Sequence, residues 1–208
     1  MSSEAKAAKS GGNTGYILKL TLTLLITCIV VAGVLGYVNS ITKDKIIAFN
    51  KEKTVQALSA VFKKANSPEF KKVAVTSKMT DGAEKYKATL EEVYSVKADG
   101  KDAGYAIKIV ASGSQGDIEM VVGVDPDGAV TGVSIVNNVE TSGIGSKVME
   151  NQPLANGTGV LDQFTGKSHK KGDLTVGKNI DAISGATVSS KGVTKGVNGA
   201  LAAVEAIG

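Results

Sequence analysis

The sequence predicts an α+β protein: a small antiparallel sheet covered by helices and preceded by one N-terminal transmembrane helix. Three patterns predict this class. They are an uncharged apolar run over 20–42, apolar residues at every second position between 103 and 136, and a helical spacing near the C-terminus. The chain has 208 residues, 42% hydrophobic and 21% charged, which is typical of one globular domain with short additions.

Composition excludes several classes of function. All 24 basic residues are lysines, and the chain has neither Arg nor Trp, so the base-reading and base-stacking surfaces of nucleic-acid-binding proteins are not expected. One Cys and one His cannot form a disulfide framework or a His/Cys metal cluster within one chain. We therefore expect no nucleic-acid partner and no metal site.

After a short N-terminal tail over 1–15, residues 16–41 are predicted to form a transmembrane anchor. About 20 apolar residues at ~1.5 Å each match the ~30 Å hydrocarbon layer of a bilayer. Tyr16 and Tyr37 stand at the two ends of the run, as interfacial aromatics do. A cleavable signal peptide or a lipid-modified Cys28 is less favoured, because the apolar run is long and continues well past that cysteine. Lysines flank both sides, so charge alone does not decide the orientation.

Residues 42–65 are predicted to form an amphipathic stalk helix, because apolar side chains recur there among Lys and Glu. The stalk would pack on the domain behind it, and a helix that lies on the membrane or binds a partner is the alternative. Pro68 follows its end. Residues 69–100 are charged and are predicted to be irregular, apart from a short helix near 80–91.

Alternating apolar residues then predict an antiparallel meander with strands near 103–111, 117–124 and 129–136. Between the last two strands, Asp125-Pro126-Asp127-Gly128 supplies the residue types of a tight turn.

The C-terminal segment has the spacing of a helix with two adjacent stripes. The apolar stripe is Val193, Val197, Leu201 and Val204, and the small stripe is Gly192, Gly196, Gly199 and Ala203. Each glycine costs a helix about 1 kcal/mol relative to alanine. Three of them therefore predict that this helix packs closely on the sheet.

Two segments after the sheet are candidates for binding. Residues 140–145 combine polar side chains with glycines, which let a ligand approach the backbone; a plain strand-to-helix connection is the alternative. Residues 181–190 place four hydroxyls around a Gly-Ala pair where the last helix opens, and the N-terminus of a helix attracts anions. A simple helix cap, with Ser184 or Ser189 as the capping residue, is the alternative here.

These residues carry a resemblance. The run Asp181-Ala182-Ile183-Ser184-Gly185-Ala186-Thr187, followed by Ser189-Ser190, resembles the attachment motif of the FMN-binding domain family. In that family FMN is esterified through its phosphate to the Thr that closes the run. The segment 140–145 resembles the family's Glu-Thr-Pro-Gly-Leu-Gly segment near the isoalloxazine, with Ser142 in place of Pro and Ile144 in place of Leu.

The resemblance covers residues 100–208 and implies a binding site. It implies that FMN is covalently attached to Thr187. It implies further contacts from Ser184, Gly185, Ala186, Ser189, Ser190, Glu140, Thr141, Gly143 and Ile144. The only histidine, His169, is not tied to this site in the sequence, and it is expected in a solvated loop with Lys170 and Lys171. A hydroxyl needs activation to act as a nucleophile, so the resemblance implies a separate flavin transferase.

The family includes the G subunit of Rnf electron-transport complexes and the C subunit of sodium-translocating NADH:quinone oxidoreductase. The single anchor and the chain length fit the Rnf G subunit. The resemblance thus implies a single-pass protein of the cell membrane whose FMN-binding domain, 66–208, is extracytoplasmic. It would relay electrons, without independent catalysis, inside a complex that couples ferredoxin oxidation and NAD+ reduction to ion transport. Its partners would be the lipid bilayer and other membrane, iron–sulfur and flavin subunits.

Two alternatives remain open at this point. The first is a flavinylated carrier of another complex, either like the C subunit of the quinone reductase or in extracellular electron transfer. The second is a flavin-free anchored binding module in which 181–190 is only a helix cap.

Overall fold

The computed structural model describes residues 14–63 and 65–207, and the chain divides into two units on either side of the Phe49–Asn50 bond. The first unit is helical throughout its described part and belongs to α1, Thr14–Val61. By length and composition this helix can cross a membrane. Two of its threonines satisfy their hydroxyls inside the helix: Thr21 and Thr23 donate to the carbonyl oxygens four residues earlier. Such bonding lets a hydroxyl lie in an apolar medium without an unpaired donor.

The helix α1 continues through the junction at which the sequence suggested two helices. No Gly or Pro occurs between Tyr37 and Val61, so nothing in this stretch breaks the helix. The segment predicted as a separate helix over 42–65 is therefore the C-terminal part of α1, and the helix ends at Val61 rather than at residue 65.

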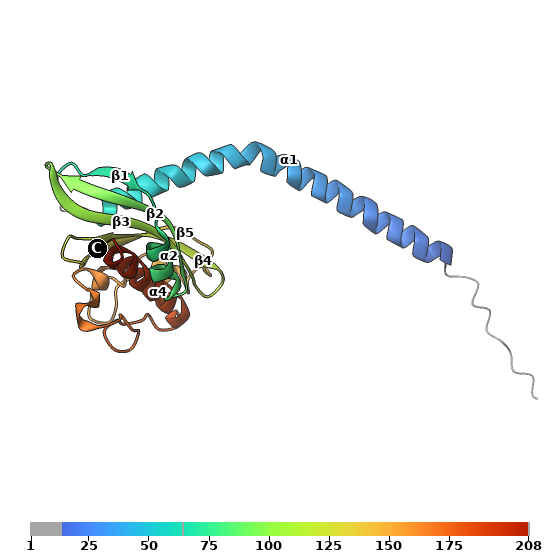
Figure 1. Cartoon of the computed structure of the whole chain (residues 1–208). Helices are drawn as coiled ribbons and strands as arrows, with labels where there is room; N and C mark the ends of the chain where they lie inside the picture. The colour runs from blue at the N-terminus through green and yellow to red at the C-terminus, as the bar shows by residue number, and fades with distance from the viewer. Residues whose placement is uncertain (1–13, 64, 208) are drawn as a thin grey trace, which may run out of the picture. The chain divides into compact units, whose positions relative to one another are not determined.

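The second unit is built on a five-stranded antiparallel sheet in the order β1-β2-β3-β4-β5, a simple meander (Figure 1). The strands are β1 Glu69–Val73, β2 Ala88–Ala98, β3 Lys101–Ser112, β4 Asp117–Val124 and β5 Val130–Asn138. The α+β class is confirmed, and the three predicted strands correspond to β3, β4 and β5. The predicted Asp125–Gly128 turn also forms, since the Gly128 N–H donates to the Asp125 carbonyl oxygen at 3.0 Å.

The prediction that 69–100 is irregular is wrong, because it holds two strands. The register of β2 shifts between Leu90 and Glu92, which breaks the alternation that marks a strand in sequence. The strand β1 is short, lies at the sheet edge and carries two lysines, so it has little apolar pattern to detect. Asp99 and Gly100 have φ values of 51° and 74° and form the tight turn between β2 and β3.

The helices of this unit are short except for the last. They are α2 Ser77–Glu84, α3 Ser146–Met149, the 3₁₀ turns η1 Asp162–Phe164 and η2 His169–Lys171, and α4 Thr187–Glu205. The helix α2 overlaps the one predicted near 80–91, but it ends before β2 begins. Both α2 and α4 pack against the same face of the sheet (Figure 1).

The sheet has apolar contacts on both faces. One face packs on α2 and α4 through a large core that includes Ile107, Ile109 and Val197, all fully buried. On the other face, the last turns of α1 contribute Leu58 and Val61 to a smaller cluster. The second unit therefore includes the end of α1 as part of its own core.

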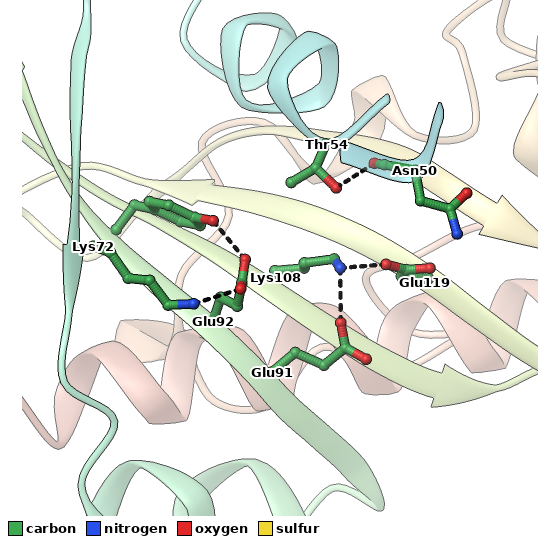
Figure 2. Close-up of polar contacts among 8 residues, drawn as sticks. Asn50, Thr54, Lys72, Glu91, Glu92, Lys108 and Glu119 are labelled. Atoms are coloured by element: carbon green, nitrogen blue, oxygen red, sulfur yellow. Dashed lines mark hydrogen bonds and ion pairs between the residues drawn. The ribbon is translucent and has the colours of Figure 1, made fainter. Parts of the chain in front are cut away.

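Beyond that smaller cluster, the second face carries paired charges (Figure 2). The Lys108 ammonium lies 3.0 Å from Glu91 and 2.5 Å from Glu119, on the neighbouring strands. Burial alone would lower the pKa of Lys108, but the hydrogen bonds to Glu119 and Glu91 raise it to about 12. Glu92 accepts from Lys72 and Tyr94 in the same way. On this face the ion pairs therefore lie beside the area that the last turns of α1 cover.

The glycine stripe on α4 has the predicted role. A Cβ at Gly192 would lie 2.8 Å from the Ser112 carbonyl oxygen, and one at Gly199 would lie 3.0 Å from the Cβ of Ala88. These distances are shorter than ordinary contacts, so α4 reaches the sheet only because these positions lack side chains.

Candidate functional site

The two segments that the sequence singled out meet at one cavity of about 230 Å³. Three stretches of chain line it: the turn between β3 and β4, the loop after β5, and the start of α4. The lining residues are Ser114, Gln115, Glu140, Thr141, Ile144, Gly145, Gly185, Ala186, Thr187, Val188 and Ser189. A larger hollow of about 790 Å³ is lined mainly by the end of α1, by β5 and by residues between 149 and 166. Neither candidate segment lines it. The smaller cavity is the candidate site, because the hydroxyls and the helix start are there.

A left-handed turn opens α4. Gly185 has a φ of +84°, which a residue with a side chain adopts only with strain. Ala186 is the N-cap, and no side chain caps the helix. The alternative with Ser184 or Ser189 as the capping residue is therefore wrong. The first backbone N–H groups of α4 are left without a side-chain acceptor, which is the usual basis of an anion site.

Thr187 is the first residue of α4, and its side chain is exposed. Among the described residues, no group hydrogen-bonds its hydroxyl, and the same is true of Ser184. Ser190 differs, because it is only 2% exposed and donates its hydroxyl to the Ala186 carbonyl oxygen at 3.0 Å. Within the 181–190 segment, Thr187 therefore carries the hydroxyl that lines the cavity, is exposed and has no hydrogen-bond partner among the described residues.

The structure separates the predicted contact residues into two groups. Seven of them line the cavity: Glu140, Thr141, Ile144, Gly185, Ala186, Thr187 and Ser189. Ser184, Gly143 and Ser190 do not. Gly143 forms a turn with φ +74°, and its N–H donates to the Ser146 hydroxyl.

The Glu140 carboxylate binds two of the other segments. Its Oε1 accepts from the backbone N–H groups of Ser114 at 2.6 Å and Gln115 at 3.3 Å. Its Oε2 accepts from the Ser189 hydroxyl at 2.6 Å. The carboxylate thus joins the β3–β4 turn, its own loop and the first turn of α4.

Apolar side chains surround this polar centre and remain exposed. Ile144 and Val188 line the cavity at 52% and 55% exposure, and neighbouring Val139 is 63% exposed. Aliphatic groups held in contact with water beside a cavity indicate a surface that a ligand or partner covers. Glu140 is the one charged residue of the lining, so a bound anion would rely on backbone N–H groups.

Sequence reasoning missed the β3–β4 turn as part of the site. Ser114 and Gln115 lie between Gly113 and Gly116, a turn composition between two predicted strands that could have been noticed. It also missed Gln163, whose side-chain amide donates to the Asp181 carbonyl oxygen at 2.9 Å and accepts from the Asp181 N–H at 2.8 Å. This pair of bonds holds the start of the 181–190 segment.

Lys170 and Lys171 are exposed as expected, but the prediction that His169 is solvated with them is wrong. Its side chain is 9% exposed, and its ring nitrogens lie 3.1 Å from Glu205 and 3.1 Å from Asn198 near the other end of α4. The ring also lies 5.6 Å from that of Tyr86. Burial and the hydrogen bond to Asp173 raise the pKa of Tyr86 to about 12. These residues form a structural cluster apart from the cavity lining.

Comparison with known proteins gives the family. A family model described as an FMN-binding domain matches residues 113–202, which includes the β3–β4 turn, the loop after β5 and the start of α4. The G subunit of the Na+-translocating ferredoxin:NAD+ oxidoreductase complex of Acetobacterium woodii is 36% identical over 193 residues, with 88% of each chain covered. The chain belongs to the family of G subunits of ion-translocating oxidoreductase complexes.

A second relative of the same kind matches over a similar length. The G subunit of the proton-translocating ferredoxin:NAD+ oxidoreductase complex of Clostridium ljungdahlii is 31% identical, and the match covers 89% of this chain and 90% of that one. Among solved structures, the C subunit of the Na+-translocating NADH-quinone reductase of Parabacteroides distasonis has a TM-score of 0.46 at 20% identity. The alignment covers 78% of this chain and 93% of that one.

The residues present fit FMN, the ligand of this domain family. The uncapped start of α4 offers N–H donors for a phosphate beside the Thr187 hydroxyl. Ile144 and Val188 offer apolar contact for a ring system. Closed small-molecule pockets usually measure ~300–1,000 Å³. A cavity of about 230 Å³ would therefore hold part of the coenzyme and leave the rest at the surface.

Proposed function

We propose that this chain is the membrane-anchored flavoprotein subunit of an Rnf-type complex that couples ferredoxin oxidation and NAD+ reduction to ion transport. In this role it relays electrons through FMN esterified to Thr187. The observation that carries the proposal is the exposed, unbonded hydroxyl of Thr187 at the start of an uncapped helix and beside a cavity. The names of the related G subunits support the complex.

Each part of the site has a task in this proposal. The Thr187 oxygen holds the phosphate covalently, so the missing Arg residues do not weaken retention. The N–H groups of the first turn of α4 offset the charge of the phosphodiester. Ile144 and Val188 cover one part of the ring. FMN supplies the electron transfer, while the protein sets its position and exposure.

Attachment requires a partner, because no described residue hydrogen-bonds the Thr187 hydroxyl to activate it. A flavin transferase with FAD as donor meets this need. The Thr187 oxygen forms a bond to the phosphorus on the flavin side of FAD. The bond from that phosphorus to the bridging oxygen breaks, AMP leaves, and the hydroxyl proton passes to a base of the transferase.

The attachment is tested by intact-protein mass spectrometry on the full chain expressed with and without a flavin transferase. The wild-type protein should gain the mass of one FMN less one water, and Thr187→Ala should abolish the gain while the protein stays folded. Thr187→Ser keeps a hydroxyl and should retain some attachment, and Thr89→Ala, at an exposed position of β2 outside the cavity lining, is the matched control that should load normally. Wild-type protein from a host with active maturation that carries no added mass would contradict the proposal.

The proposed arrangement places α1 in the cell membrane and the FMN-binding domain on the extracytoplasmic side. The apolar, exposed surface of α1 supports the membrane location. The side is tested in a Cys28→Ser background with Lys170→Cys, since Lys170 is exposed. A maleimide that cannot pass the membrane should label this cysteine in intact cells. Labelling only after lysis would place the domain in the cytoplasm.

Membership in the complex is tested separately from the flavin. The wild-type chain should co-purify from native membranes with the other proteins of a ferredoxin:NAD+ oxidoreductase. Co-purification with a different oxidoreductase would instead identify a flavinylated carrier of another complex.

A further inference from the structure

The two edge strands of the sheet differ in how they are protected from pairing with another chain. The edge strand β1 has five residues, and three of them, Glu69, Lys71 and Lys72, are charged. The edge strand β5 has nine residues, with no charge and no proline. Charges, prolines and short length are common ways to keep an edge strand from pairing. Two register shifts interrupt β5, but the run 132–135 between them is regular, so this edge can accept a further strand.

The backbone of β5 is paired on its outer side at one residue. The Val130 N–H donates to the Lys167 carbonyl oxygen, and the Val130 carbonyl oxygen accepts from the Gly166 N–H, both at 2.8 Å. Within the described residues, no segment outside the sheet forms backbone hydrogen bonds with 131–138. Every second residue of an edge strand directs its N–H and C=O away from the sheet. Beyond Val130, these outward groups are therefore open to a partner strand.

The larger hollow, of about 790 Å³, runs along this open edge. Six consecutive residues of β5, 130–135, line it. Successive side chains of a strand point to opposite faces of the sheet, so a hollow that touches all six lies at the edge of the strand. Its walls come from both faces: Val61 belongs to the smaller cluster on one face, and Leu161 belongs to the large core on the other. The hollow therefore has the position of one further strand.

The charges around the hollow indicate which kind of segment fits. The described residues of the lining include three carboxylates, those of Asp125, Glu150 and Asp162, and one ammonium, that of Lys63. The whole chain has a net charge of +4, so this excess of negative charge is a local feature. Complementary charge selects partners and fixes register at an interface. A basic segment meets the carboxylates, whereas the β5 of a second copy has no charge to offer.

We propose that the outer edge of β5 binds an extended segment of another protein, bearing lysine or arginine, as a sixth strand of the sheet. In this mode of recognition, backbone hydrogen bonds give affinity and alternate side chains give specificity. Apolar side chains of the segment contact Val133, Ile135 and Leu161, and its basic side chains reach the carboxylates. The hollow shares no lining residue with the cavity beside Thr187. Strand binding is therefore independent of the flavin.

Amide hydrogen exchange tests the pairing on the full chain, compared between native membranes and the chain purified alone in detergent. The amides of 132–135 that exchange fast in the purified chain are those directed outward. In native membranes they should exchange at least about tenfold more slowly, because each donates to the added strand. The amides of β1 are the internal control and should exchange alike in both samples. Equal exchange of 132–135 in the two samples would overturn the proposal.

Photo-crosslinking in the same membranes identifies the segment. Thr165 lines the hollow and is exposed, so p-benzoylphenylalanine takes its place, and crosslinked peptides are sequenced by mass spectrometry. The crosslinked peptide should come from another protein and should alternate apolar residues with at least one lysine or arginine. A peptide from a second copy of this chain, an acidic peptide, or protected amides with no crosslinked protein would each contradict the proposed occupant.

A synthetic copy of the crosslinked segment tests the backbone contribution. Two further versions carry N-methyl groups on alternate amides. Only every second amide of an added strand faces β5. One version should therefore bind the purified full chain as the unmodified peptide does, and the other should lose at least about tenfold in affinity. Equal affinity of the two versions would exclude strand addition.

Charge reversal beside the hollow tests the charge contribution. Glu150→Lys should weaken binding of the unmodified peptide by about threefold, since repulsion replaces an exposed ion pair. The control Glu84→Lys makes the same change at an exposed position of α2 outside the hollow and should bind as the wild type does. A peptide with glutamate at its basic positions should prefer Glu150→Lys to the wild type. The same affinity of both chains for the basic peptide would rule out the charge pairing.

Discussion

The two ends of α4 handle polar side chains in opposite ways. At the start, the Thr187 hydroxyl is exposed and no described residue bonds it, and the helix has no side-chain cap. Three turns later, Asn198 is 4% exposed. Its Nδ2 donates to the Leu174 carbonyl oxygen at 2.8 Å, and its Oδ1 accepts from the Leu174 N–H at 3.0 Å. The same helix thus has one polar side chain without a hydrogen-bond partner in the described residues, Thr187, and one whose amide both donates and accepts, Asn198.

This difference indicates separate tasks along one element. A buried polar group without a partner costs stability, so the pairing at Asn198 serves the fold. A free hydroxyl at the surface costs nothing and stays available for reaction. We therefore expect changes at the second end to alter stability, and changes at the first end to alter FMN loading. The remaining predictions test this separation.

The largest expected effect on stability is at Asn198. The variant Asn198→Ala leaves the N–H and C=O of Leu174 unpaired in a buried place, at a cost of about 1–3 kcal/mol for each group. The free energy of unfolding of the full chain in detergent, from urea titration, should fall by about 2–5 kcal/mol. The amount of FMN attached per folded molecule should stay at the wild-type level.

The control for this prediction is Lys195→Ala on the exposed side of the same helix, which should change stability by no more than about 0.5 kcal/mol. A loss of FMN from the folded fraction of Asn198→Ala would show that the two ends of α4 are coupled.

A smaller effect on stability is expected in the middle of α4, where the same change to alanine can be compared at Gly192 and at Gly196. A Cβ at Gly192 would lie 2.8 Å from the Ser112 carbonyl oxygen, which is backbone and cannot move alone. A Cβ at Gly196 would lie 2.7 Å from the flexible end of Met120. Overpacking costs about 1–3 kcal/mol, whereas alanine gains about 1 kcal/mol over glycine in a helix.

Thermal unfolding should therefore show Gly192→Ala to be destabilised and Gly196→Ala to be close to wild type. Both positions follow the 181–190 segment, so the amount of FMN attached per folded molecule should stay at the wild-type level in both variants. Equal stability of the two variants would contradict the close contact between Gly192 and the sheet.

Much of the fold was readable from local patterns. The apolar run, the period of two in β3 to β5 and the stripes of α4 each repeat within a few residues, so a window of sequence reveals them. The strand β2 escaped because its register shifts at Leu90, and β1 escaped because an edge strand needs few apolar residues. A β-bulge forms through pairing with a neighbouring strand, so the local sequence pattern of one strand does not predict it.

The features of the site can be separated in the same way, into those that adjacent residues determine and those that depend on tertiary contacts. The sequence alone determined the α+β class, the apolar N-terminal helix and the hydroxyl-rich start of the last helix, because each follows from the chemistry of adjacent residues. Only the tertiary structure decided that Ser190 is buried while Thr187 is open, that His169 belongs to a structural cluster, and that Glu140 joins three segments. The reason is physical: these roles depend on contacts between residues distant along the chain, and such contacts exist only once the sheet and α4 have packed together.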